Sequence, residues 1–195
     1  MGRKFYVAFL PWMMFAFVAR AGGQGAVWAA AAALLGALLV AQAEQRDGGA
    51  SWFSRSSILL AAVLLATGLM AWGSGFDRWS RVAAALGLMA VTAIPIRGMP
   101  FVEHYARDLV PPALLGTERF RATNRAVAQT WVVAFAAMAA SMGIAAAVDL
   151  PLVATVGNWI APALVLVWCT ERTTRQWQLE FGEEPDGGIV GLFEA

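Results

Sequence analysis

Histidine and cysteine are almost missing from this chain, which has one of each, His104 and Cys169, in 195 residues. A single cysteine cannot form an internal disulfide, and one thiol with one imidazole cannot build the ligand set of a structural zinc site. A haem held by two histidines of this chain is excluded for the same reason. We therefore expect no metal and no cofactor.

Charge is also scarce, since Asp, Glu, Lys and Arg make up 14% of the residues, whereas soluble domains carry about a quarter. Apolar residues reach 59%, which excludes disorder and is too much for the interior of so small a soluble protein. The net charge of +1 gives no global field that would attract nucleic acid. The composition indicates an integral membrane protein.

Six apolar segments approach the ~20 residues, with ~17 as a minimum, that a transmembrane helix needs. They are rich in alanine and leucine and lack period-two alternation, which favours helices over barrel strands. We predict an all-α integral membrane protein, a bundle of about six transmembrane helices with an interfacial helix between the fourth and the fifth. Its single domain covers 1–170, with spans at 5–21, 24–43, 57–73, 82–96, 126–148 and 150–170, a cytoplasmic loop at 97–125 and an acidic cytoplasmic tail at 171–195.

The basic residues are distributed unevenly between the two sides of this six-span arrangement. Eleven of the fourteen lysines and arginines fall on the side that carries both termini. Positively charged loops stay in the cytoplasm, so we expect a multi-pass inner-membrane protein with both termini cytoplasmic. A signal peptide is the alternative, because Arg3-Lys4, an apolar run and Ala19-Arg20-Ala21 resemble one. Its cleavage would leave five spans.

No Asp, Glu, Lys, Arg or His lies in the middle of any predicted span, although proton relays and ion pathways usually contain such groups. No nucleophile stands at a useful spacing from a base. We therefore predict a non-enzymatic protein without catalytic residues. Uncharged polar groups at depth could form an intramembrane site or could each bond a nearby backbone carbonyl; these are Gln129, Thr130, Trp131, Thr155 and Asn158.

The loop at 97–125 contains two predicted helices. The first follows Pro100 and ends before Pro111-Pro112, and we expect its apolar face, with Phe101 and Tyr105, to lie against the bilayer. Glu103, His104 and Asp108 do not share one helix face, which favours a solvated, salt-bridged surface over a metal site. The second helix begins after Thr117 as N-cap and continues into the fifth span.

Five arginines of this loop could bind anionic lipid headgroups or a partner, which could be another membrane protein or a second copy. The alternative is that they only reach the interface and fix the topology. They are Arg97, Arg107, Arg119, Arg121 and Arg125.

The opening segment Phe9-Leu10-Pro11-Trp12-Met13-Met14-Phe15 resembles the start of the bacterial intracellular septation protein A family. The resemblance covers roughly residues 5–170 and includes Asn124 and Trp131 at a seven-residue interval. The segment PFVEHYARDLVPP is also similar to small bacterial membrane proteins with a Pro-Phe-x-x-x-Tyr-Ala-Arg pattern. The acidic tail and the long arginine-rich loop depart from the septation family. The resemblance implies an inner-membrane protein of envelope maintenance or division, without catalytic residues.

Two functional hypotheses follow. The first is a non-enzymatic protein of envelope or septum maintenance that acts through lipid or protein contacts of the basic loop. The second is a small transporter or lipid-handling protein for an uncharged or amphipathic cargo, and it requires some of the polar groups at depth to meet at a cavity.

Overall fold

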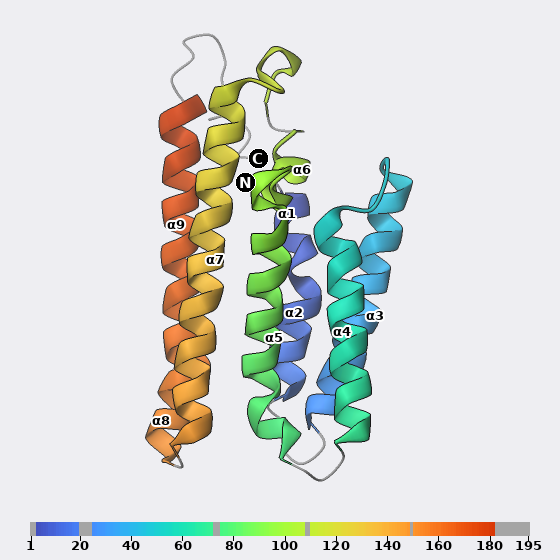
Figure 1. Cartoon of the computed structure of the whole chain (residues 1–195), viewed down its shortest axis with the longest axis vertical. Helices are drawn as coiled ribbons and strands as arrows, with labels where there is room; N and C mark the ends of the chain where they lie inside the picture. The colour runs from blue at the N-terminus through green and yellow to red at the C-terminus, as the bar shows by residue number, and fades with distance from the viewer. Residues whose placement is uncertain (1–2, 20–24, 72–74, 108–109, 149, 182–195) are drawn as a thin grey trace.

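A computed structural model describes residues 3–19, 25–71, 75–107, 110–148 and 150–181, and every regular element in these ranges is helical (Figure 1). Along the chain, the elements are α1 (Arg3–Ala8), α2 (Leu10–Val18), α3 (Gly25–Arg46), α4 (Trp52–Met70), α5 (Phe76–Ala93), η2 (Ile94–Arg97), α6 (Phe101–Ala106), η4 (Pro112–Leu114), α7 (Glu118–Ala147), α8 (Pro151–Thr155), η5 (Val156–Ile160) and α9 (Ala161–Phe181).

Five helical stretches in the described part of the chain are long and apolar enough to cross a membrane. They correspond to the second to sixth predicted spans, which identifies the chain as a candidate multi-pass membrane protein. Several extend beyond the expected apolar runs, because residues with charged or aromatic side chains continue the helices at their ends. The stretches are Gly25–Arg46, Trp52–Met70, Phe76–Arg97, Glu118–Ala147 and Pro151–Phe181.

The first predicted span is not one continuous helix. It is divided into α1 and α2, and Pro11 occupies the first turn of α2. Proline has no N–H to donate, and its ring clashes with the carbonyl one turn earlier, so it is tolerated at a helix start but not inside a helix. The chain turns at Phe9, whose N–H donates to the carbonyl of Tyr6 at 3.1 Å. The described part of the first predicted span therefore consists of two consecutive helices.

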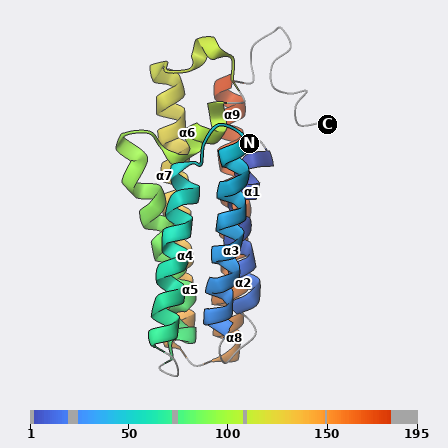
Figure 2. The same cartoon turned by 90° about the vertical axis from the view of Figure 1, so that its right-hand side faces the viewer.

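The helices run side by side along one axis (Figures 1 and 2). Helix α3 packs against α2 and α4, α5 packs against α7, and α7 packs against α9. The start of α1, helix α6, the start of α7 and the end of α9 lie at the same end of the bundle. We call this the arginine-rich end, because the loop arginines named above are there.

Helix α6 turns its apolar face toward the protein. Phe101 and Tyr105 are 2% and 5% exposed, and the Phe101 ring stacks on that of Phe53 in α4. The expectation that this face lies against the bilayer is wrong. Amphipathic spacing shows that a helix has an apolar face but not which surface covers that face.

The start of α7 is as predicted. The Thr117 side chain accepts a hydrogen bond from the N–H of Phe120 at 3.2 Å and so caps the helix, which then continues without a break to Ala147. Helix α9 extends to Phe181, past the predicted end of the last span at 170. Three features of the sequence analysis lie outside the described residues: most of the predicted acidic tail (182–195), Asp108, and Arg20-Ala21 of the possible signal-peptide site.

Candidate functional site

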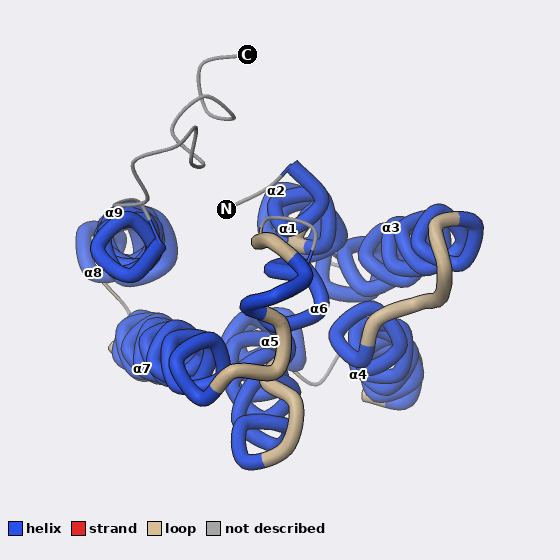
Figure 3. Tube along the Cα trace, turned by 90° about the horizontal axis from the view of Figure 1, so that it is seen from above, coloured by secondary structure: helices blue, strands red, loops and turns tan. Residues whose placement is uncertain are grey.

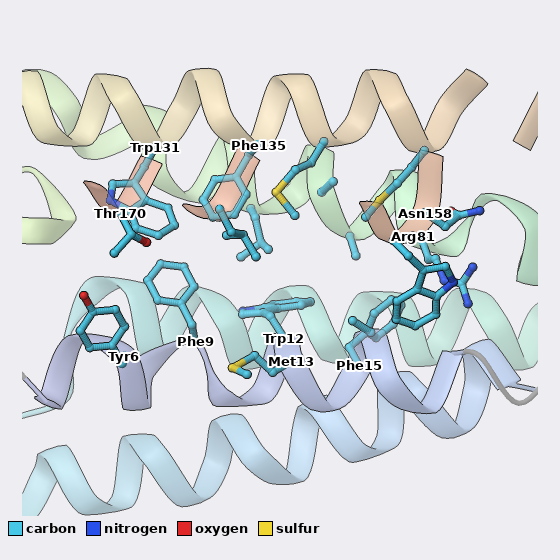
Figure 4. Close-up of a pocket in the computed structure, with 18 residues that line it drawn as sticks. Tyr6, Phe9, Trp12, Met13, Phe15, Arg81, Trp131, Phe135, Asn158 and Thr170 are labelled. Carbon is cyan, nitrogen blue, oxygen red and sulfur yellow. The ribbon is translucent and has the colours of Figure 1, made fainter. Parts of the chain in front are cut away.

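A cavity of about 290 Å³ lies between α2, α5, α7 and α9 (Figure 4). Its walls are almost entirely apolar and aromatic, and the few polar groups are near its two ends. The lining residues are Tyr6, Phe9, Trp12, Met13, Phe15, Ala16, Arg81, Ala84, Ala85, Leu88, Trp131, Phe135, Met138, Met142, Asn158, Trp159, Leu166 and Thr170.

The cavity opens on the side of the bundle. The residues of its floor are buried, with Trp12 at 7% and Phe135 at 2% exposure. The residues at its rim are exposed, and they are Tyr6 on α1, Met13 on α2 and Leu166 on α9. Helices α2 and α9 stand apart when the bundle is seen from above (Figure 3). Because the exposed rim residues belong to α1, α2 and α9, the cavity is open along the side of the bundle, and we call it the lateral groove.

Three helices contribute lining residues at a regular helical spacing. Positions 9, 12, 13 and 16 repeat at i, i+3, i+4 and i+7, and positions 81, 84, 85 and 88 follow the same rule. Such positions share one face of a helix. The continuous face of α7 runs from Trp131 to Met142, which is roughly 16 Å along the helix axis at 1.5 Å per residue.

An aromatic platform forms the end of the lateral groove nearer the arginine-rich end. The Phe9 and Trp131 rings are stacked, with centroids 4.9 Å apart and planes inclined by 18°. Phe5 packs edge-on behind Trp131 at 5.4 Å. The Trp131 Nε1–H is buried and has no hydrogen-bond acceptor in the described part of the chain. A buried donor without an acceptor costs about 1–3 kcal/mol.

Arg81 of α5 lies at the opposite end of the lateral groove (Figure 4). Its guanidinium donates to the backbone carbonyl of Ala19 at 2.7 Å and lies 5.4 Å from the centre of the Trp159 ring. Asp77, one turn earlier, instead accepts from the N–H of Ala26 at 2.7 Å. No described carboxylate forms an ion pair with Arg81. Within the described part of the chain, the partners of this guanidinium are therefore a backbone carbonyl and an aromatic ring.

A π-helical segment, η5, forms the corner of the lateral groove beside Arg81. Gly157 lies directly against α7, and the carbonyl of Gly157 accepts from Ser141 Oγ at 3.1 Å. The wider turn places Asn158 and Trp159 on the groove wall. Asn158 Nδ2 donates to the carbonyl of Ala154 at 2.9 Å, which leaves the second amide hydrogen available. Short π segments inside α-helices often occur at functional sites.

Of the five polar residues singled out at depth, two line the lateral groove, Trp131 and Asn158, and they lie at its opposite ends (Figure 4). Gln129 is exposed on another face of α7. The Thr130 hydroxyl donates to the carbonyl of Ala126 at 3.0 Å, and that of Thr155 donates to the carbonyl of Pro151 at 2.9 Å. Each of these two hydroxyls therefore donates its hydrogen bond to a carbonyl of its own helix.

Three of the five loop arginines form ion pairs within the protein, and the other two do not pair with a described carboxylate. Arg119 pairs with Glu180 of α9 at 2.9 Å, Arg107 with Glu103 at 3.2 Å, and Arg125 with Glu118 at 3.7 Å. Arg97 and Arg121 are exposed and form no ion pair with the described carboxylates. The pair between Arg119 and Glu180 joins the start of α7 to the end of α9.

A hydrogen-bonded cluster holds α6 on the turn between α3 and α4. The Tyr105 hydroxyl donates to Glu44 Oε1 at 3.0 Å and lies 2.9 Å from Ser51 Oγ, and Glu44 Oε2 accepts from the N–H of Ser51 at 2.8 Å. Burial raises the pKa of Tyr105 well above its ordinary value, and the nearby Glu44 carboxylate acts in the same direction. The hydroxyl therefore stays protonated. Among the residues that the structure describes, no cluster of three or more His, Cys, Asp or Glu could hold a metal ion.

Arg81, Phe9 and Trp12 are not among the predicted site residues. The predicted fourth span begins at 82, which places Arg81 in a loop, and an aromatic residue of an apolar span is expected to face lipid or to pack between helices. One pattern in the sequence could have indicated them. Positions 9, 12, 13 and 16 and positions 81, 84, 85 and 88 have the same helical spacing, and in the second set an arginine precedes three apolar residues on one helix face.

Comparison with family models, with curated proteins and with solved structures finds no match to this chain. The resemblance to the septation family therefore remains a prediction, and the features that can indicate a function are the lateral groove and the arginine-rich end.

Proposed function

We propose that this protein is a non-enzymatic, multi-pass lipid-handling membrane protein that takes one hydrocarbon chain of a membrane lipid into the lateral groove. The observation that supports this is the sideways opening of an apolar cavity between two helices. A cavity that opens toward lipid is accessible to molecules dissolved in the bilayer, whereas a substrate from water would need an opening at one end of the bundle.

The dimensions of the lateral groove fit one chain. A volume of about 290 Å³ lies at the lower limit of ligand pockets, which usually hold ≈ 300–1,000 Å³. The α7 face between Trp131 and Met142 offers roughly 16 Å of continuous contact. The methionine side chains Met138 and Met142 can adjust to chains of different shape, because a thioether on three rotatable bonds repacks easily. A second chain of the same lipid would stay in the bilayer.

The proposed orientation follows from the distribution of charge. The arginine-rich end faces the cytoplasm of a bacterial inner membrane, with both termini on that side. Helices α1 and α2 then form the first of six spans, since they run beside α3 along the bundle (Figure 2). Arg81 lies toward the opposite leaflet.

Filling the lateral groove should prevent capture of a lipid. Ala84 is a buried lining residue of α5, and Ala84→Phe places a ring where the chain would lie. The measurement is photocrosslinking in vesicles with a phospholipid that carries a diazirine on one acyl chain, followed by mass-spectrometric mapping. We expect labelling of the peptides around Trp131 and Met138 to fall by at least about tenfold, because the ring and the acyl chain compete for one volume.

The matched control is Ala90→Phe, which adds the same ring to an exposed position of the same helix. Labelling of the groove peptides should then stay at the level of the unmodified protein. Equal labelling of the groove peptides in Ala84→Phe and Ala90→Phe would contradict the proposal, since the probe would then only report general contact with lipid.

The arginine-rich end supports a second candidate function, the envelope role implied by the septation resemblance. Arg97 and Arg121 are exposed at one end of the bundle and have no ion-pair partner among the described carboxylates, so they are available to anionic headgroups or to a partner protein. Each such contact contributes about 1 kcal/mol.

This second function predicts a loss of anionic lipid from the purified protein. Combining Arg97→Gln with Arg121→Gln should lower the affinity for phosphatidylglycerol, followed by its copurification in mild detergent, by about 30-fold, as expected for two lost contacts of about 1 kcal/mol each. Arg55→Gln removes an exposed charge at the start of α4, outside the loop, and serves as the control. If the control lowers the retained phosphatidylglycerol as much as the double variant, the loop has no special role.

A further inference from the structure

We infer that the occupant of the lateral groove is an anionic phospholipid, with its phosphate at Arg81 and its acyl chain directed along the groove toward Trp131. This inference rests on the lipid-handling function proposed above and adds the class of headgroup, the direction of the chain and the leaflet of origin.

The Arg81 guanidinium has unused hydrogen-bonding capacity. It carries five N–H donors in a planar fork that suits phosphate oxygens, and among the described residues it forms one hydrogen bond, to the carbonyl of Ala19. Placing a guanidinium against an apolar cavity is unfavourable unless an anion accompanies it. Because no described carboxylate pairs with Arg81, an anionic ligand is the natural partner.

Polar groups of the π-helical segment lie beside Arg81. Trp159 lies against the guanidinium with 5.4 Å between the Arg81 Cζ and the ring centre, which orients the charge at the groove wall. Asn158, on the same π-helical segment, has a free amide hydrogen that could donate to a headgroup oxygen. Tryptophan is also the side chain that prefers the headgroup level of a bilayer.

Polarity falls along the lateral groove. Beyond Arg81 and Asn158 the wall becomes apolar, with Phe15 followed by Trp12 and Phe135 (Figure 4). A lipid has the same gradient, from a charged headgroup to a hydrocarbon chain. At the other end the described lining residues carry only neutral polar groups, the Trp131 indole and the hydroxyls of Tyr6 and Thr170, and a neutral donor binds an anion less strongly than a guanidinium does.

The direction of the lipid determines the leaflet from which it comes. Arg81 lies near the start of α5, at the end of the bundle opposite the arginine-rich end. A phosphate bound there belongs to the leaflet on that side, which is the outer leaflet in the orientation proposed above. The chain then points toward the bilayer midplane, as it does in free lipid.

The test uses the full-length protein in phosphatidylethanolamine vesicles and two photoreactive probes with the same diazirine-labelled chain, one a phosphatidylglycerol and one a phosphatidylcholine. The wild type should incorporate the anionic probe about tenfold more efficiently at the groove peptides. Arg81→Gln should remove this preference and keep labelling by the zwitterionic probe. The amide introduced by Arg81→Gln can still donate a hydrogen bond, and Arg81→Lys, which retains a cation, should keep a preference for the anionic probe.

Arg78→Gln is the matched control, because Arg78 is exposed on the same helix and does not line the lateral groove. It should leave the preference unchanged. A diazirine at the end of the acyl chain should label peptides that contain Phe9 or Trp131. Labelling of the peptide that contains Arg81 would mean that the lipid binds in the opposite direction, and it would overturn the inference.

Other results overturn the inference in separable ways. If the wild type and Arg81→Gln prefer the anionic probe equally, Arg81 does not bind an anionic headgroup. The lipid-handling function would still stand, provided that Ala84→Phe abolishes labelling. A free fatty acid probe that competes better than phosphatidylglycerol would make the ligand a carboxylate. Crosslinks that join groove peptides of two protein copies in place of lipid would make the occupant a second copy.

Discussion

Phe5→Ala should lower the free energy of unfolding by about 3 kcal/mol, the low end of the range for truncating a buried phenylalanine. The Phe5 side chain is 1% exposed and is surrounded by five other aromatic rings. In a membrane, helix association depends on packing more than on the hydrophobic effect, so the cavity left by the ring is the main cost. The five rings belong to Tyr6, Phe9, Phe101, Tyr105 and Trp131.

The position of Phe5 makes the effect extend beyond one contact. Its ring joins α1 to α6 through Phe101 and to α7 through Trp131. It therefore supports, from behind, the stacked pair of Phe9 and Trp131 that closes one end of the lateral groove. Aromatic pairs of this kind add about 0.5–1.5 kcal/mol each beyond the area that they bury.

The measurement is reversible unfolding in mixed detergent micelles, followed by tryptophan fluorescence. Phe17→Ala is the matched control, because Phe17 is 69% exposed on α2 and its removal leaves no internal cavity. It should change the free energy of unfolding by less than about 0.5 kcal/mol. Phe5→Leu should recover most of the lost stability. A Phe5→Ala protein as stable as Phe17→Ala would show that this cluster is not packed as described.

The course of the chain was largely predictable from the sequence, because the length of an apolar run is a local property. Five of the six predicted spans are long helices. Their ends were less predictable. The apolar run of the fourth span starts at 82, whereas its helix begins six residues earlier at Phe76, because Arg78 and Arg81 are compatible with a helix although not with an apolar run.

The length of an apolar run does not determine the division of the first span or the orientation of α6. The effect of Pro11 was visible in the sequence, but a proline within an apolar run can either kink a helix or begin a new one. The apolar face of α6 was identified correctly. Its partner was not, because Phe53 and Phe5, which cover Phe101, come from segments far away in the sequence.

The lateral groove itself could be predicted only in part. Trp131 and Asn158 stood out because polar side chains are rare at depth. Arg81 is 50 residues from Trp131, and the sequence does not show that α2, α5, α7 and α9 enclose one space. A cavity is the volume that packing leaves unfilled, and it depends on how closely each pair of helices approaches.

Gly157 fixes one such approach, and Gly157→Ala should destabilise the protein by about 1–3 kcal/mol, as overpacking of a close contact does. A Cβ at this position would lie 2.6 Å from the carbonyl oxygen of Ser141 and 2.7 Å from the Cβ of Ala145. Neither atom can move by a change of rotamer, so α7 and the π-helical segment must separate. Asn158 and Trp159 would move with that segment, and labelling of the groove by the photoreactive lipid should fall as well.

Two other glycines of the same bundle provide controls. Replacing them by alanine also changes the helix propensity, but it does not create the same close contact. A Cβ at Gly87 would meet only the Leu60 side chain, which can rotate away, and a Cβ at Gly143 of α7 would meet nothing within 4 Å. Gly143→Ala should therefore be neutral or stabilising by up to about 1 kcal/mol, with Gly87→Ala between the extremes. Thermal unfolding of the three variants in one detergent should rank them in that order. Equal melting temperatures for Gly157→Ala and Gly143→Ala would mean that α7 and η5 are not in close contact, and the groove corner built on that contact would have to be abandoned.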